Sequence, residues 1–190
     1  MAKRIESAHG RRHNRAVLHI RNRMIPAAVT ALSLMVIVAV LSYLNFDFKY
    51  GLGASGIVFA SFGGSAFALF MLPYSRSSNV RRFIKSYLIA GLFGYLGFLT
   101  VPYMGTVASV GLVMFSVSVL LIVTGSEHPP ALGIASAFVL YNIDYVGIII
   151  VMVAALILAF IRMVMLKYVY VLEKESLKAI EKIDKRLGAT

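Results

Sequence analysis

The sequence predicts an all-α polytopic membrane protein with six transmembrane segments, and three observations lead to this fold class. The chain of 190 residues is 59% hydrophobic and only 14% charged, which is more apolar surface than a soluble domain of this length can bury. Apolar runs recur along it that are long enough, at about 1.5 Å per helical residue, to cross a hydrocarbon core about 30 Å thick. The basic residues gather between alternate runs rather than evenly along the chain.

Six apolar segments are expected to cross the membrane. The first two are free of charged residues, the third contains Lys85 near its start, and the fifth has only 13 residues, roughly 20 Å as a helix. They cover 24–44, 51–72, 83–101, 106–124, 129–141 and 146–162.

The distribution of charge predicts the direction of these crossings. With the N-terminus in the cytoplasm, the inner segments hold 18 of the 19 Lys and Arg residues, and the outer connections hold only Lys49. A five-span arrangement would instead place the seven basic residues of 162–190 outside. The positive-inside rule therefore predicts six spans in the plasma membrane, with both termini cytoplasmic.

Two basic cytoplasmic segments are expected to flank the transmembrane domain, residues 24–166. Residues 1–23 carry seven Lys and Arg but no apolar h-region, which indicates a cytoplasmic tail rather than a signal peptide. We expect its partners to be anionic lipids of the inner leaflet, not nucleic acid. Residues 167–190 have apolar residues at helical spacing, which predicts an amphipathic cytoplasmic helix that is either solvated or paired with another subunit.

Six spans divide into two sets of three, and the second set enters from the opposite side. The fold is therefore expected to be a 3+3 arrangement of inverted halves, although no residue-level repeat relates them. The middle members are segments 51–72 and 129–141, which are also the two segments with interruptions.

The first interruption is a glycine pair flanked by serines. Ser61 and Ser65 bracket Gly63 and Gly64, a combination that lets backbone leave helical angles. A break there would start a half-helix near Gly64, with its amide groups facing the middle of the membrane.

The second interruption lies in the stretch TGSEHPPA. Gly125 suits a left-handed C-terminal cap, and Pro129 and Pro130 suit the first turn of the next helix. The N–H groups of Ala131 and Leu132 would then lack partners.

Two half-helices that point their N-termini at one place create partial positive charge, which suits a small anion. Ionisable side chains beside a span are costly, so Glu127 and His128 are expected to be functional and to exchange protons. The predicted binding residues are Ser61, Gly63, Gly64, Ser65, Glu127, His128, Ala131 and Leu132, with Pro129 and Pro130 as the structural motif.

Structural alternatives stay open for each motif. Glycine and serine in spans commonly serve helix packing, which is the expected role of Gly53, Gly56 and the glycines at 91, 94 and 97. A Pro-Pro kink is commonly structural, and a structural role of Glu127 and His128 as caps of helix ends stays open. With no cysteine and three of the four histidines in the N-terminal tail, the chain has no obvious metal or hydrolytic site, and neither enzyme activity nor a cofactor is expected.

The sequence resembles the HPP family of integral membrane proteins, named for the motif that stands here as His128-Pro129-Pro130. The similarity extends to a Ser-Phe-Gly-x-Ser segment, here 61–65, and covers roughly residues 25–165. Between the motifs it is loose. The family's Pro-Arg-Asn reads Val80-Arg81-Arg82, and its Gly-Gly-His reads Lys85-Ser86-Tyr87, so that histidine is absent.

The resemblance implies transport of nitrite or a similar small anion, which agrees with the site expected from the helix ends. We therefore expect a small-anion transporter or channel, coupled to protons if His128 titrates, and a homo-oligomer because six short spans form a thin wall. Arg81 at the inner surface would steer anions or bind lipid head groups. Two other functions remain open: a cation or proton pathway that uses Glu127, and a sensor or scaffold acting through the C-terminal helix.

Overall fold

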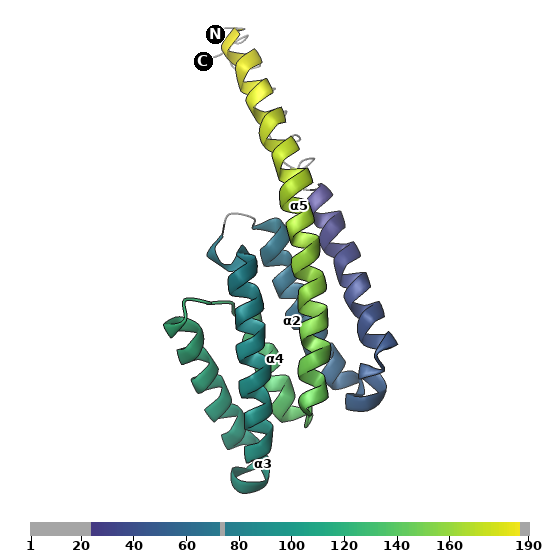
Figure 1. Cartoon of the computed structure of the whole chain (residues 1–190), viewed down its shortest axis with the longest axis vertical. Helices are drawn as coiled ribbons and strands as arrows, with labels where there is room; N and C mark the ends of the chain where they lie inside the picture. Colours follow the sequence, from purple (N-terminus) through teal and green to yellow (C-terminus); the bar gives the residue numbers. More distant parts are fainter. Residues whose placement is uncertain (1–23, 73–74, 187–190) are drawn as a thin grey trace, which may run out of the picture.

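The computed structural model describes residues 24–72 and 75–186, with side chains as far as Lys167, and these residues contain helices and no strands (Figure 1). The elements in order are an N-terminal helix Met24–Tyr43, α2 (Phe46–Met71), the short 3-10 helix η1 (Arg76–Ser78), α3 (Val80–Val123), α4 (Pro130–Leu140) and α5 (Tyr145–Arg186). The N-terminal helix, α2, α3 and α5 as far as Lys167 are long and apolar enough to cross a membrane. The all-α prediction is confirmed.

α2 runs without interruption through the Gly63-Gly64 pair, so the predicted half-helix near Gly64 is wrong. The only residue of α2 with non-helical angles is Gly51, with φ 85° and ψ 160°, close to the start of the helix. The serines that flank the pair donate to carbonyl groups one turn earlier, Ser61 to Ile57 and Ser65 to Ser61. Helical hydrogen bonds therefore keep their geometry here, and the conformational freedom of the glycines is not used.

α3 consists of two helical stretches that meet at Gly105, where φ is 78° and the chain reverses direction (Figure 1). The two stretches pack against each other: Thr100 Oγ1 donates to Ser109 Oγ over 2.8 Å, and a Cβ at Gly97 would lie 1.9 Å from Val113. The reversal thus falls within the connection predicted at 102–105.

α4 begins as the sequence predicts and lies between α2 and α3. Gly125 has φ 60°, and the amides of Gly125 and Ser126 donate to the carbonyls of Ile122 and Leu121, which is a Schellman motif that ends α3. Pro130 occupies the first turn of α4. Glycine allows close packing on both sides. A Cβ at Gly94 of α3 would lie 3.0 Å from the Ala135 backbone, and one at Gly133 of α4 would lie 2.3 Å from the Ser61 hydroxyl oxygen of α2.

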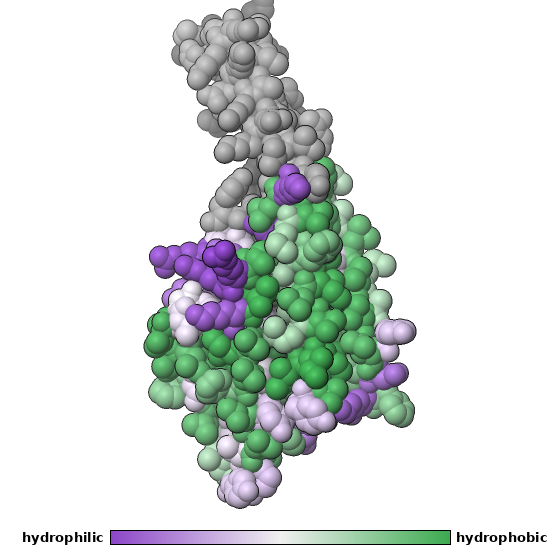
Figure 2. Space-filling model, in the orientation of Figure 1, coloured by the Kyte–Doolittle hydropathy of each residue, from purple (hydrophilic) through white to green (hydrophobic). Residues whose placement is uncertain are grey.

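The predicted packing role is confirmed for Gly53, Gly91, Gly94 and Gly97, each of which faces atoms of another segment within 3.3 Å of a built Cβ. Gly56 is different, since nothing lies within 4 Å of its Cβ position. The outer surface of the bundle is largely apolar, and polar residues gather toward its ends (Figure 2).

The end of α5 and the start of the N-terminal helix lie at the same end of the bundle (Figure 1). The helix predicted at 167–190 is a continuation of α5 as far as Arg186, extending well beyond the bundle. The basic tail predicted at 1–23 lies outside the described residues.

Candidate functional site

The two sequence motifs meet at one hydrogen bond inside the bundle. His128 lies in the loop before α4 with a side chain only 1% exposed, and Ser65 on α2 is fully buried. The Nε2 atom of His128 is 2.8 Å from the Oγ atom of Ser65. The expectation that these two segments approach each other is therefore correct, although α2 reaches the site as an unbroken helix.

Tyr87 of α3 completes the cluster and was missed in the sequence. Its hydroxyl is fully buried, lies 2.6 Å from Ser65 Oγ and donates to the carbonyl oxygen of Ser61 over 3.2 Å. The Ser65 hydroxyl also lies within 3.0 Å of that carbonyl. Tyr87 stands where the family resemblance would place a histidine, and this polar substitution was the available signal.

The cluster contains two hydroxyl hydrogens and can accommodate either protonation pattern of the imidazole. When Nε2 carries no proton, Ser65 can donate to it while Tyr87 donates to the Ser61 carbonyl. When Nε2 is protonated, it can donate to Ser65, whose own hydrogen then turns to the Ser61 carbonyl. Apart from the proton itself, the two patterns differ only in the rotation of hydroxyl groups, so the hydrogen bond between Ser65 and His128 can form in both.

Aromatic rings enclose the cluster and exclude water from it. Phe83 meets the imidazole edge-on with the ring centroids 5.3 Å apart, and Phe62 contacts the Tyr87 ring at 5.0 Å. Both phenylalanines are fully buried. Hydrogen bonds and interactions between charges are stronger in such a low-dielectric environment than in water.

The second ring nitrogen of His128 is buried without a hydrogen bond. The backbone of Ser77 in η1 approaches the ring, but no group meets Nδ1 within hydrogen-bonding distance and angle. A buried polar atom left in this way carries an energetic cost of about 1–3 kcal/mol, so it marks a position where a polar ligand would be stabilising.

The amide groups predicted to hold the anion are already occupied. The N–H of Ala131 donates to the His128 carbonyl over 3.0 Å, and that of Leu132 donates to the Pro129 carbonyl over 3.1 Å. The first turn of α4 is tightened into bonds between residues three apart, which satisfies amides that an ideal helix leaves free. The prediction of unpartnered amides at these two residues is therefore wrong.

The remaining predicted residues lie around the cluster rather than within it. Gly64 touches Pro130, since its built Cβ would lie 3.1 Å from the proline ring, and Gly63 has nothing within 4 Å. Glu127 is exposed, and none of the hydrogen bonds of His128 involves it. Arg81 is also exposed and lies in the first turn of α3, where its backbone N–H donates to the capping side chain of Asn79.

Among the residues with described side chains, no group of three or more His, Cys, Asp or Glu could hold a metal ion.

Arg162 of α5 is a buried cation, with a side chain only 1% exposed. The sequence pattern counted it among the inner-surface charges, because hydropathy alone does not reveal which side of a helix faces the interior.

A family model described as "HPP, transmembrane region" matches residues 17–172. The chain belongs to the HPP family. The match covers the N-terminal helix, α2, α3 and α4 in full and α5 as far as residue 172, so it includes the α2 and α4 segments that meet at His128. No curated protein and no solved structure matches this HPP-family chain. Its family membership and its long apolar helices identify it as a membrane protein.

Proposed function

We propose that this HPP-family protein transports a small inorganic anion of the nitrite type across the membrane together with a proton. The observation that carries the proposal is the buried hydrogen bond between His128 and Ser65, where two membrane-embedded segments meet. Ionisable groups are rare inside membrane proteins and usually mark ion or proton pathways. The substrate class, nitrite or a similar small anion, is what the resemblance to the HPP family implies.

The coupling follows from the cost of burying charge. A protonated imidazole surrounded by Phe83 and Tyr87 would be expensive alone, and an unaccompanied anion at the same depth would be equally so. Each one offsets the cost of the other when they bind together. Proton and anion are therefore expected to enter the site as a pair.

The anion is proposed to bind beside His128 at the start of α4. Nδ1–H of a protonated ring can donate to it, which gives the buried nitrogen its missing partner. The positive end of the α4 dipole adds a favourable field, even though the first two amides are occupied. Hydroxyls of Ser61 and Ser65 lie on the facing side of α2 and can reorient toward the ion.

The proposed topology has six crossings, with the two stretches of α3 counted separately and α4 as a short fifth one. The positive-inside distribution favours cytoplasmic termini and the plasma membrane, with the basic segments against anionic lipids. A 3+3 inverted arrangement and a homo-oligomer remain part of this proposal. Two segments of this arrangement were predicted to be interrupted. α2 is continuous at Gly63-Gly64, and only the interruption before α4 is present.

Flux into proteoliposomes tests the function. Nitrite uptake driven by an inward proton gradient is expected in the wild type and should fall at least tenfold in His128→Ala. Glu127→Gln is the matched control, since it changes the neighbouring exposed residue and should leave uptake unchanged. Wild-type uptake by His128→Ala would overturn the proposal.

A proton pathway without an anion is the second candidate, and the Tyr87–Ser65–His128 chain of hydrogen bonds favours it. Nitrite uptake and membrane current, measured together, separate the two functions. A proton–anion pair has no net charge, so the proposed transport accumulates nitrite without a current. A proton pathway takes up no nitrite and carries a current that reverses at the proton equilibrium potential. If Glu127→Gln abolished flux, a cation pathway through Glu127 would be supported instead.

A further inference from the structure

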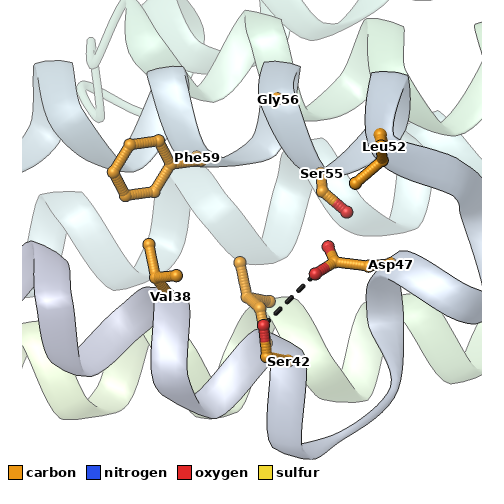
Figure 3. A pocket seen from close by; sticks show the side chains of 8 residues that line it. Val38, Ser42, Asp47, Leu52, Ser55, Gly56 and Phe59 are labelled. Atoms are coloured by element: carbon orange, nitrogen blue, oxygen red, sulfur yellow. Dashed lines mark hydrogen bonds between the residues drawn. The ribbon is translucent and has the colours of Figure 1, made fainter.

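A crevice with a volume of about 250 Å³ lies between the N-terminal helix and the first half of α2 (Figure 3). Its walls are mostly apolar and include Val38 from the N-terminal helix and Leu52 and Phe59 from α2. Gly56 contributes no side chain, and nothing lies within 4 Å of its Cβ position. The crevice is therefore open where a larger residue would fill it.

One end of the crevice is polar. Figure 3 shows the Asp47 carboxylate close to the hydroxyls of Ser42 and Ser55, while Val38 and Phe59 lie toward the other end. Asp47 belongs to the short helical stretch that precedes the break at Gly51. The break at Gly51 thus places the Asp47 carboxylate at one end of the apolar crevice.

The polar atoms at this end offer acceptors only. Ser42 donates its hydroxyl hydrogen to Asp47 Oδ2 over 3.2 Å, and Ser55 donates to the Gly51 carbonyl over 3.3 Å. With both hydrogens in use, the two hydroxyl oxygens and the carboxylate present lone pairs to a ligand. The group that best complements them is one that donates hydrogen bonds and accepts none.

No cation among the described side chains pairs with this carboxylate. Lys49 pairs with Asp144, 2.8 Å away, so the neighbouring lysine is engaged elsewhere. A carboxylate next to apolar surface and lipid is costly without a positively charged partner.

We propose that this crevice binds a membrane lipid with a primary ammonium head group. The ammonium supplies three N–H donors and one positive charge to Asp47, Ser42 and Ser55. The acyl chain lies along Val38 and Phe59, where it covers apolar surface. A glycerol head group would bring acceptors of its own and no positive charge, and a quaternary ammonium would bring a positive charge but no N–H. This site is independent of the transport function proposed above.

The experiment compares three lipids with identical acyl chains, added in mixed micelles to the delipidated full-length protein. The lipids are phosphatidylethanolamine, phosphatidylcholine and phosphatidylglycerol. Native mass spectrometry measures lipid retention, and thermal unfolding measures stabilisation. Phosphatidylethanolamine is expected to be retained most strongly. Asp47→Asn should weaken its retention roughly tenfold, the equivalent of about 1.4 kcal/mol, and remove the preference.

Two variants test the apolar part of the site. Gly56→Leu fills the crevice and should lower retention of all three lipids. Gly111→Leu is the matched control, because Gly111 also has nothing within 4 Å of its Cβ position but lies on α3. Lipid retention by Gly111→Leu should equal that of the wild type.

Three results would overturn the proposal. The first is equal retention of phosphatidylglycerol and phosphatidylethanolamine, which indicates a non-specific lipid layer only. The second is an unchanged preference in Asp47→Asn. The third is a dimer that dissociates in Gly56→Leu while lipid retention stays at the wild-type level, which would show that a second copy of the chain occupies the crevice.

Discussion

Ser65 and His128, 63 positions apart in the chain, share a 2.8 Å hydrogen bond between Oγ and Nε2. The bond joins α2 to the loop before α4 in the interior of a membrane protein, and the Tyr87 hydroxyl extends it to α3. Because Ser65 is the only member that lies within hydrogen-bonding distance of both other side chains, its hydroxyl holds the three segments in one polar cluster.

Ser65→Ala is expected to lower anion flux at least tenfold and the free energy of unfolding by about 1–3 kcal/mol. The variant leaves Nε2 of His128 buried without its partner. Proteoliposome uptake and denaturant unfolding measure the two effects. Ser118→Ala is the control, since the Ser118 hydroxyl bonds only to the Met114 carbonyl one turn earlier. Equal behaviour of the two variants would contradict a special role for Ser65.

Tyr87→Phe is expected to have a smaller effect on flux than Ser65→Ala, with a loss of about 1 kcal/mol in stability. Ser65 keeps its bonds to His128 and the Ser61 carbonyl, so the link between α2 and the loop survives. The same two measurements apply. Tyr95→Phe serves for comparison, because Tyr95 is half-buried and contacts Phe98 through its ring. If both tyrosine variants matched the wild type, the cluster would not depend on the Tyr87 hydroxyl.

Gly53→Ala is expected to destabilise the fold by about 1–3 kcal/mol, whereas Gly56→Ala should be neutral or stabilise it by up to about 1 kcal/mol. A methyl group at Gly53 would lie 2.7 Å from the Tyr141 ring, and one at Gly56 meets nothing. Thermal unfolding of both variants measures the difference. In a Tyr141→Ala background the penalty at Gly53 should disappear. A penalty that persisted there would place its origin elsewhere.

The Asp144 carboxyl should make stability depend on acid pH. Partial burial alone would raise its pKa, but hydrogen bonds from Lys49 and Tyr50 and the charge of Lys49 outweigh this and lower the pKa below its ordinary value of 3.8. A carboxyl with a lowered pKa adds stability above pH 3.8, which is lost as the pH falls through the lowered value.

Asp144→Asn should therefore be less stable than the wild type at neutral pH, and the difference should shrink as the pH drops below about 4. Thermal unfolding in detergent between neutral and acid pH measures it. Asp47→Asn is the matched comparison, because Asp47 has no ion-pair partner among the residues with described side chains. A constant difference between Asp144→Asn and the wild type at all pH values would exclude this linkage.

The sequence predicted helices and turns wherever local chemistry decides them. Gly125 ends α3 because its missing Cβ permits a left-handed cap, and Pro130 begins α4 because a helix does not need its N–H. It failed at Gly63 and Gly64, which can break a helix but do not have to. There the Ser61 and Ser65 hydroxyls bond back to the helix, and the chain continues through the pair.

The residues of the candidate site divide in the same way, into those that the sequence identified and those that it missed. The HPP motif identified His128, and a costly ionisable residue in an apolar region pointed to function. Tyr87 was not found, because a tyrosine in place of the family's histidine marks the position but does not show which side chains its hydroxyl will meet. The amides of Ala131 and Leu132 were misjudged, since a helix start can tighten its own hydrogen bonds instead of leaving them for a ligand.

The sequence by itself determined that the chain is an all-helical membrane protein, because the apolar length of a segment and the angles that glycine and proline permit are local properties. Only the tertiary structure decided that Ser65, Tyr87 and His128 share one buried cluster and that Asp47 has an open crevice beside it. Contacts between helices depend on which face each helix turns inward, and that is set by the packing of all the helices together.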